Sequence, residues 1–172
     1  MRPFKDGDAE SMLEYHGDPT VVRYIPWDVR TLEEIEESNE KNKDAFQLNE
    51  EGDYLTLALC RKSDDQLVGQ MNAMYRSKEH MRAEFGYVVN PRFSGQGYIT
   101  EAATALISAL FASGLFHSVF ANMDPRNHAS EKVAIRVGLN KEAHHKEDYW
   151  FKGEWTDSFI YAIVKDEWQS RH

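Results

Sequence analysis

The stretch between residues 82 and 112 places the tightest limits on how this chain can fold. Residues 82–90 read RAEFGYVVN, an alternating, mostly apolar run that predicts a β-strand. Pro91 prevents that run from continuing as a paired central strand, and Gly95 and Gly97 follow it. The next apolar positions recur at helical spacing and are Ile99, Ala103, Leu106, Leu110 and Phe111. A strand, a glycine-rich turn and a helix therefore follow one another directly.

Strand-like and helix-like segments alternate irregularly along the rest of the chain. The helix over 6–18 takes Asp8 as its N-cap, and the helix over 31–46 opens with a capping box of Thr31 and Glu34. Strands are expected at 2–4, 54–60, 66–75, 82–90 and 118–123 and in a hairpin over 147–164 that turns near Lys152 and Gly153. Further helices are expected from Ile99 to a stop at Gly114 and from the N-cap Asn127 to a stop at Gly138. This order predicts a mixed α/β (α+β) domain with one central twisted mixed sheet of about seven strands flanked by about four helices.

Length and composition limit the class of protein. The chain has 172 residues, which suits a single domain over 1–172, and its formal net charge of −9 argues against a nucleic-acid partner. The charge is compatible with a cationic substrate, although solubility alone explains it. Cys60 is the one cysteine, so we expect no internal disulfide and no thiolate metal cluster. Without an apolar run of about 18 residues or a signal peptide, we expect a cytoplasmic protein and no membrane association.

Gly95 and Gly97 suggest a binding site for a phosphate. Nothing in the chain matches a P-loop, and the dinucleotide fingerprint fails because Thr100 stands where its third glycine belongs. The third interpretation is an anion site made by the first backbone amides of a helix, which glycines leave open to close approach. Arg92 would add positive charge there. The alternative is a helix that simply begins at a glycine-rich turn.

The segment RFSGQG at 92–97 fits the Gln/Arg-x-x-Gly-x-Gly/Ala signature of the GCN5-related N-acetyltransferases (GNAT). Further segments resemble the RimJ/RimL-like branch of that family, in its order: RPFKDGDAE, RYIPW, AEFGYVVNPRFSGQGYITEA, NHAS and the closing G-E-W-x-D. The chain departs from the branch at Val88 and Leu139, where tryptophan and phenylalanine are usual. The resemblance implies a GNAT-like fold and direct acetyl transfer from acetyl-CoA to a primary amine.

The resemblance also assigns residues to the cofactor. Backbone amides from Gly95 through Thr100 would hold its pyrophosphate, and its pantetheine arm would pair with the preceding strand end. A backbone amide of Val88 or Val89 would donate to the thioester oxygen. The residues implied for acetyl-CoA are Val88, Val89, Asn90, Arg92, Gly95, Gln96, Gly97, Tyr98, Ile99, Thr100 and Asn127.

Glu84 and Ser130 are the candidate catalytic residues. The acceptor amine has to lose a proton before it attacks, and several relatives carry a glutamate at the place of Glu84 on this strand. Alternation puts Glu84, Gly86 and Val88 on one face, although an exposed glutamate at a strand edge is equally compatible. Ser130 matches the serine of the family's Asn-x-x-Ser pattern, the proposed general acid. It could instead bond backbone amides in the first turn of its helix.

The acceptor site rests on aromatic residues. By resemblance, the loop with Tyr24 and Trp27 borders the acceptor pocket, although aromatics beside a proline often pack in a core. Tyr149, Trp150 and Trp155 near the last turn could line the same pocket, pack in the core or form the face of a homodimer.

The expected acceptor is a protein or peptide N-terminus, with a small-molecule amine as second choice. No metal is expected, because His144 and His145 point to opposite faces of a strand and no other metal-ligand spacing occurs. Two other functions remain open: a non-catalytic acyl-CoA-binding module and a nucleotide-dependent oxidoreductase.

Overall fold

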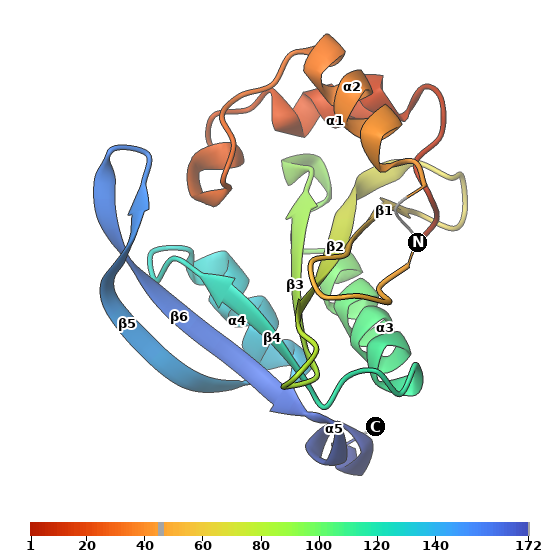
Figure 1. Cartoon of the computed structure of the whole chain (residues 1–172). Coiled ribbons are helices and arrows are strands. Elements are labelled where there is room, and N and C mark those ends of the chain that lie inside the picture. The colour runs from red at the N-terminus through yellow and green to blue at the C-terminus, as the bar shows by residue number, and fades with distance from the viewer. Residues whose placement is uncertain (45–46, 172) are drawn as a thin grey trace.

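The computed structural model describes residues 1–44 and 47–171, which fold around one six-stranded sheet (Figure 1). The strand order is β1-β2-β3-β4-β6-β5, and all neighbours are antiparallel except β3 and β4. The strands are β1 (Tyr54–Cys60), β2 (Leu67–Ser77), β3 (Arg82–Val89), β4 (Ser118–Met123), β5 (Asn140–Phe151) and β6 (Glu154–Val164). This is the mixed α/β architecture that the sequence predicts.

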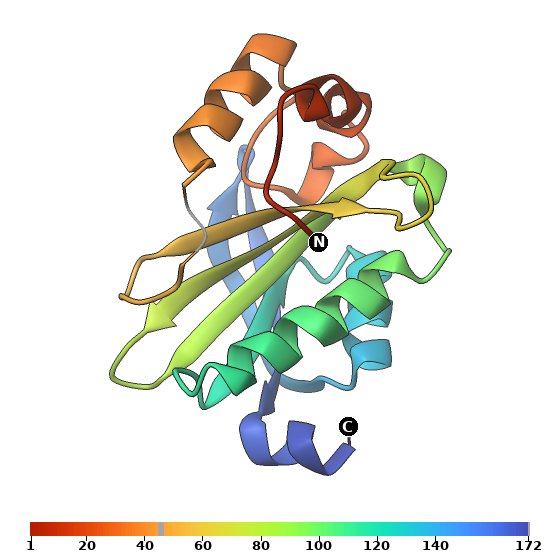
Figure 2. The same ribbon diagram turned by 90° about the vertical axis from the view of Figure 1, so that its right-hand side faces the viewer.

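Helices cover both faces of this sheet. Helices α1 and α2 lie on one face, and α3 and α4 lie on the other (Figure 2). The helices are α1 (Asp8–His16), α2 (Leu32–Asn42), α3 (Tyr98–Ala112), α4 (His128–Val137) and α5 (Lys165–Arg171), with short 3₁₀ turns η1 (Val22–Tyr24) and η2 (Pro91–Phe93). Two apolar cores result, and the alternating strand residues are shared between them: Ala58 and Val88 pack with α1 and α2, whereas Leu59 and Phe85 pack with α3.

The parallel pair β3 and β4 separates soon after it forms. Only Arg82, Ala83 and Glu84 pair with β4, opposite Ser118, Val119 and Phe120. Beyond Glu84 the two strands diverge, and Figure 1 shows the resulting wedge between β3 on one side and β4 and β6 on the other. Residues 85–89 of β3 keep their pairing with β2 and leave their other edge open toward the wedge.

Three expectations about elements are corrected. The strand expected at 2–4 is a single bridge between Arg2 and Ala58, so the sheet has six strands and not seven. Strand β5 begins at Asn140 rather than at 147, and α5 follows β6 where no helix is expected.

Helix boundaries mostly follow the sequence signals. The capping box of Thr31 and Glu34 is confirmed, as are the N-cap Asn127 and the left-handed Gly138 at the end of α4. Helix α1 has Gly7 and not Asp8 at its N-cap. Helix α2 ends at Asn42, and residues 45–46 of the helix expected over 31–46 lie outside the described residues. No helix within the described ranges is long and apolar enough to cross a membrane.

Candidate functional site

The glycine-rich corner before α3 exposes backbone amides. Gly95 and Gly97 both adopt left-handed conformations, with φ of 76° and 86°, and Gly97 caps α3 without a side-chain hydrogen bond. The helical ladder begins where the Glu101 amide donates to the Gly97 carbonyl at 3.0 Å. The amides before it are the helix's unpaired donors. A methyl group on either glycine would meet nothing within 4 Å, so the space in front of these amides is open.

A hollow of about 320 Å³ lies in front of this corner, and we call it the corner hollow. The loop and first turn of α3 form one wall, and α4 forms the other through Lys132, Val133 and Arg136. Two cationic side chains therefore share a hollow with the positive end of a helix dipole, an arrangement that suits an anion.

Asn90 and Arg92 hold the loop from outside this hollow. The Asn90 side chain accepts from the Arg92 amide at 3.0 Å and donates to Glu14 at 2.9 Å. The Arg92 guanidinium also donates to Glu14 at 2.9 Å. These hydrogen bonds, and most of all the one from Asn90, lower the pKa of Glu14. The Gln96 side chain donates back to the Arg92 carbonyl at 3.3 Å. The Arg92 side chain is 70 % exposed and does not line the corner hollow.

The end of β3 presents its backbone to the wedge. The Asn90 amide donates to the Val68 carbonyl on β2 at 2.9 Å. Amides of successive strand residues point to opposite sides, so the Val89 amide faces the wedge and the Val88 amide faces β2. Gly69 permits this close approach of β2, because a methyl group there would lie 2.3 Å from the Val88 carbonyl oxygen.

A second hollow of about 440 Å³ lies along β3, and we call it the central hollow. Glu84, Gly86 and Val88 line it, as do Phe85 and Tyr87 between them, and Tyr24 at the end of η1 and Trp27 in the loop after it form another wall. Glu84 and Asp124 are its carboxylates. Each pairs with an arginine: Glu84 with Arg76 at 2.5 Å and Asp124 with Arg126 at 2.6 Å.

Tyr87 joins the two hollows, since it lines both. Its hydroxyl donates to Ser130 Oγ at 3.2 Å, and Ser130 lines the central hollow. Burial raises the pKa of Tyr87, so the phenol keeps its proton and remains a donor at neutral pH. The Ser130 amide donates to the N-cap Asn127 at 3.2 Å, which leaves the serine hydroxyl for other contacts.

Lys152 fastens the loop that carries Tyr24 and Trp27. It stands at the turn between β5 and β6, and its Nζ donates to the carbonyls of Val22 at 2.9 Å and Trp27 at 2.8 Å. It also forms an ion pair with Asp28 at 3.2 Å. The tip of the last hairpin thus holds one wall of the central hollow in place.

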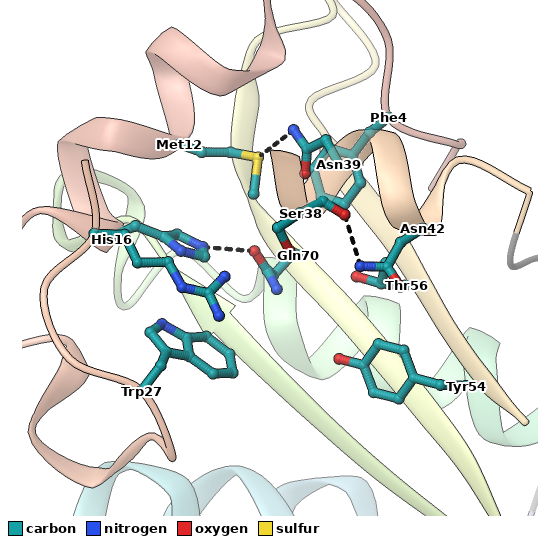
Figure 3. Close-up of a pocket in the computed structure, with 11 residues that line it drawn as sticks. Phe4, Met12, His16, Trp27, Ser38, Asn39, Asn42, Tyr54, Thr56 and Gln70 are labelled. Atoms are coloured by element: carbon teal, nitrogen blue, oxygen red, sulfur yellow. Dashed lines mark hydrogen bonds between the residues drawn. The ribbon is translucent and has the colours of Figure 1, made fainter. Parts of the chain in front are cut away.

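A third hollow of about 170 Å³ lies between α1, α2 and strands β1 and β2, and we call it the side hollow (Figure 3). Trp27 and Tyr54 line both the side and the central hollows. His16 is buried and its Nε2 lies 2.8 Å from Gln70 Oε1. Burial lowers the pKa of His16, which favours the neutral imidazole.

The remaining candidates lie elsewhere. Tyr149, Trp150 and Trp155 are 52 %, 58 % and 59 % exposed at the tip of the last hairpin and line none of the three hollows. His144 lies 2.6 Å from Asp157. Within residues 1–44 and 47–171, no three His, Cys, Asp or Glu side chains gather as a metal site.

Sequence reasoning missed several residues that line the hollows. Lys132 and Arg136 are four residues apart on α4, so helical spacing could have placed them on one face. Tyr87 stands beside Gly86 in a segment already singled out. Arg30 and Arg76 carry no local signal, because only the tertiary fold brings them to the hollows.

Comparison with known proteins identifies the family to which the chain belongs. Residues 1–140 match the acetyltransferase (GNAT) domain family. The chain is 30 % identical to the uncharacterized N-acetyltransferase YnaD of Bacillus subtilis, over 98 % of this chain and 94 % of YnaD.

Solved structures show the same fold. A GNAT-family acetyltransferase from Bacillus anthracis superposes with a TM-score of 0.86 at 30 % identity, covering 96 % of this chain and 93 % of that one. RimL, a ribosomal L7/L12 alpha-N-protein acetyltransferase solved with coenzyme A, superposes with a TM-score of 0.81 at 19 % identity, with the same coverage of 96 % and 93 %. The chain therefore belongs to the GNAT family and is an N-acetyltransferase that uses acetyl-CoA.

Proposed function

We propose that this enzyme acetylates the N-terminal amine of a protein or peptide by direct attack while both substrates are bound. The observation that carries this proposal is the charge balance of the central hollow. Its carboxylates Glu84 and Asp124 are each paired with an arginine, so it offers no surplus negative charge for a second ammonium group. That balance favours an acceptor with one reacting amine over a polyamine. The ribosomal-protein substrate of the similar RimL fold agrees with this choice.

The corner hollow fits the diphosphate of acetyl-CoA. Its open helix amides, the left-handed Gly95 and Gly97, and the nearby Lys132 and Arg136 all favour an anion. The open edge of β3 offers backbone partners to the amide-bearing pantetheine arm. When bound, acetyl-CoA supplies an acetyl thioester. We assign the Val89 amide as the donor to the thioester oxygen, because it faces the wedge.

Glu84 and Ser130 are proposed to move the protons. Glu84 lies in the central hollow beside Gly86 and accepts the proton of the incoming ammonium, directly or through a water molecule. Ser130 donates a proton to the departing thiolate. Since Tyr87 donates to the serine oxygen, the serine hydrogen is left to point elsewhere. Tyr87 is therefore proposed as a positioning residue.

A test of this proposal combines substrate choice with two substitutions. Wild-type enzyme is assayed for thiol release from acetyl-CoA with short peptides that have free or blocked N-termini, and with spermidine and free amino acids. We expect turnover of the free peptides only. Glu84→Gln and Ser130→Ala should each lower kcat by about 100-fold or more, the usual size of a lost acid or base. Glu79→Gln, at an exposed glutamate of the β2–β3 turn, is the matched control.

Two outcomes would count against the proposal. Faster turnover of spermidine than of any peptide would assign a small-molecule acceptor. Tight acetyl-CoA binding without transfer to any amine would indicate a non-catalytic acyl-CoA-binding module. If both substitutions leave kcat unchanged, Glu84 and Ser130 do not carry the protons.

A further inference from the structure

We propose that the side hollow binds a carboxylate of the acceptor, held by Arg30 about two strand spacings from the reacting amine. The inference rests on the proposed function, because it takes the amine to react in the central hollow. It narrows the acceptor to an amine that carries a carboxylate several bonds away.

The sheet gives the two hollows one continuous floor. Thr56 on β1, Asn72 on β2 and Gly86 on β3 stand directly opposite one another. Thr56 lines the side hollow, whereas Asn72 and Gly86 line the central hollow. Neighbouring strands lie about 4.8 Å apart, so a group over β1 is about 10 Å from one over β3. Trp27 and Tyr54 border both hollows, so an extended ligand can cross between them.

Arg30 supplies the charge. Its guanidinium lies 4.5 Å from the centre of the Trp27 ring and lines the side hollow. Among the described residues no carboxylate lies within ion-pair distance of it. The Glu34 carboxylate acts on Arg30 electrostatically without an ion pair, and it accepts from the Thr31 amide at 2.8 Å in the capping box. Burial lowers the pKa of Arg30, which marks a cation partly withdrawn from water. Such a cation interacts strongly with an anion that reaches it.

Buried polar groups line the side hollow next to Trp27 (Figure 3). His16 is 1 % exposed, stacks on Trp27 with ring centres 5.7 Å apart, and bonds to Gln70, which is 5 % exposed. Trp27 Nε1 and His16 Nδ1 are buried without a hydrogen-bond partner within the described residues. Buried polar groups are usually satisfied, and each one left unpaired is costly. A ligand carboxylate that shifts the Trp27 ring slightly would accept from Trp27 Nε1, whereas His16 Nδ1 is an acceptor when Nε2 donates to Gln70 Oε1 and needs a donor such as a peptide amide.

The central and side hollows differ in how their charges are paired, and this difference determines the sign of the charge expected on the ligand. In the central hollow each carboxylate has an arginine partner, and in the side hollow the arginine has no carboxylate partner. The unmatched charge along the shared floor is thus positive. An anionic group on the acceptor complements it, whereas a second ammonium group would be repelled.

Distance limits where the carboxylate stands on the acceptor. The carboxylate of a free α-amino acid is too close to its own amine to span neighbouring strands. An extended chain gains at most about 3.3–3.6 Å per residue, so an acidic side chain on the second residue of a peptide, or the C-terminal carboxylate of a tripeptide, reaches the distance of about 10 Å. These two sources share one chemistry, and the experiment separates them.

The test uses two matched pairs of acceptors. One pair is the tripeptide amides Ala-Glu-Ala and Ala-Gln-Ala, and the other is the tripeptide Ala-Ala-Ala and its C-terminal amide. Steady-state kcat/KM is measured with acetyl-CoA, and Kd is measured separately by calorimetry with CoA-loaded protein. We expect the carboxylate member of at least one pair to be favoured about 10-fold or more in both quantities. The pair that shows the preference identifies the source.

Arg30→Gln should reduce that preference to about 2-fold or less, and Arg30→Lys should retain part of it, because lysine keeps the charge but loses the planar fork. Lys62→Gln, at an exposed cation in the β1–β2 turn, should retain all of it. The Tm of each variant and its Kd for acetyl-CoA should stay at the wild-type values.

The outcomes separate the two proposals. Equal use of both members of each pair by wild type, or an undiminished preference in Arg30→Gln, would overturn the carboxylate site and leave the proposed function standing. Arg30-dependent binding of a carboxylate peptide that is never acetylated would overturn the proposed function and leave the carboxylate site standing.

Discussion

Gly69 shows how one missing side chain shapes the site. Its place on β2 lies against the Val88 carbonyl, and any Cβ there would approach that oxygen to 2.3 Å. Real Cβ atoms do not come so close, so the backbone of β3 would have to move. That backbone carries the Val89 amide proposed as the thioester donor.

Gly69→Ala should therefore lower both stability and activity. Overpacking of this kind costs about 1–3 kcal/mol in the free energy of unfolding, which urea denaturation measures. We also expect kcat/KM for acetyl-CoA to fall more than the loss of folded protein accounts for, since the strand end shifts. Wild-type kinetics in a folded Gly69→Ala variant would show that the position of this strand end does not matter.

Some residues of the site could be predicted from the sequence and others could not. Strand alternation alone places Glu84, Gly86 and Val88 on one face of β3, and all three line the central hollow, although Phe85 and Tyr87 line it too. The direction of Arg92 could not be predicted, because its partner Glu14 is brought to it only by the packing of α1. Arg30 could not be predicted either, because its proposed role depends on the absence of a carboxylate within ion-pair distance.

Among the elements, the hairpin of β5 and β6 affects the candidate site most, because its turn holds one wall of the central hollow. Its turn residue Lys152 bonds to two carbonyls and one carboxylate of the loop that follows η1. The start of β5 could not be predicted from its own residues: the segment from Asn140 to Lys146 is polar on both faces and is almost entirely exposed. Pairing with β6 makes it a strand, and such pairing is not visible in a local pattern.

Lys152→Met should loosen the acceptor wall without disturbing the cofactor site. We expect KM for the peptide to rise about 3- to 30-fold, as expected for lost charge-assisted hydrogen bonds of about 1–2 kcal/mol, while Kd for acetyl-CoA stays the same. Hydrogen exchange of residues 22–28 should become faster. Lys146→Met, at an exposed lysine of the same hairpin, is the control. If hydrogen exchange of residues 22–28 is unchanged in Lys152→Met, this segment keeps its conformation without the contacts of Lys152.

At the scale of the whole molecule, the net charge of the chain is negative, whereas the charged side chains that line the corner hollow are positive. The net charge is −9, yet the corner hollow gathers Lys132 and Arg136 at the start of α3. The net charge therefore carries no prediction about this local environment, and the glycine spacing is the feature of the sequence that suggests an anion there. A surface average carries no information about a single concave site.

Acetyl-CoA should raise the Tm by about 5–10 °C at a hundredfold excess over its Kd, which corresponds to about 2.7 kcal/mol. NADH and ATP should have little effect. The double variant Lys132→Gln and Arg136→Gln should weaken acetyl-CoA binding by about 10-fold or more and make it less sensitive to salt. Lys165→Gln, away from the hollow, serves as the control. A double variant that binds as wild type does would leave the helix amides as the sole anion site.

The divergence of β3 from β4 has a consequence for the order of events. The corner hollow is lined by the start of α3 and by α4, and the central hollow is lined by β3, by β4 and by the segment from Tyr24 to Trp27, with Ser130 of α4 at its border. Tyr87 lines both hollows, so under the proposed function the cofactor and the acceptor would meet there, each from its own hollow. The two substrates would then not compete for one site, and we expect initial-rate kinetics in which both are bound before any product leaves.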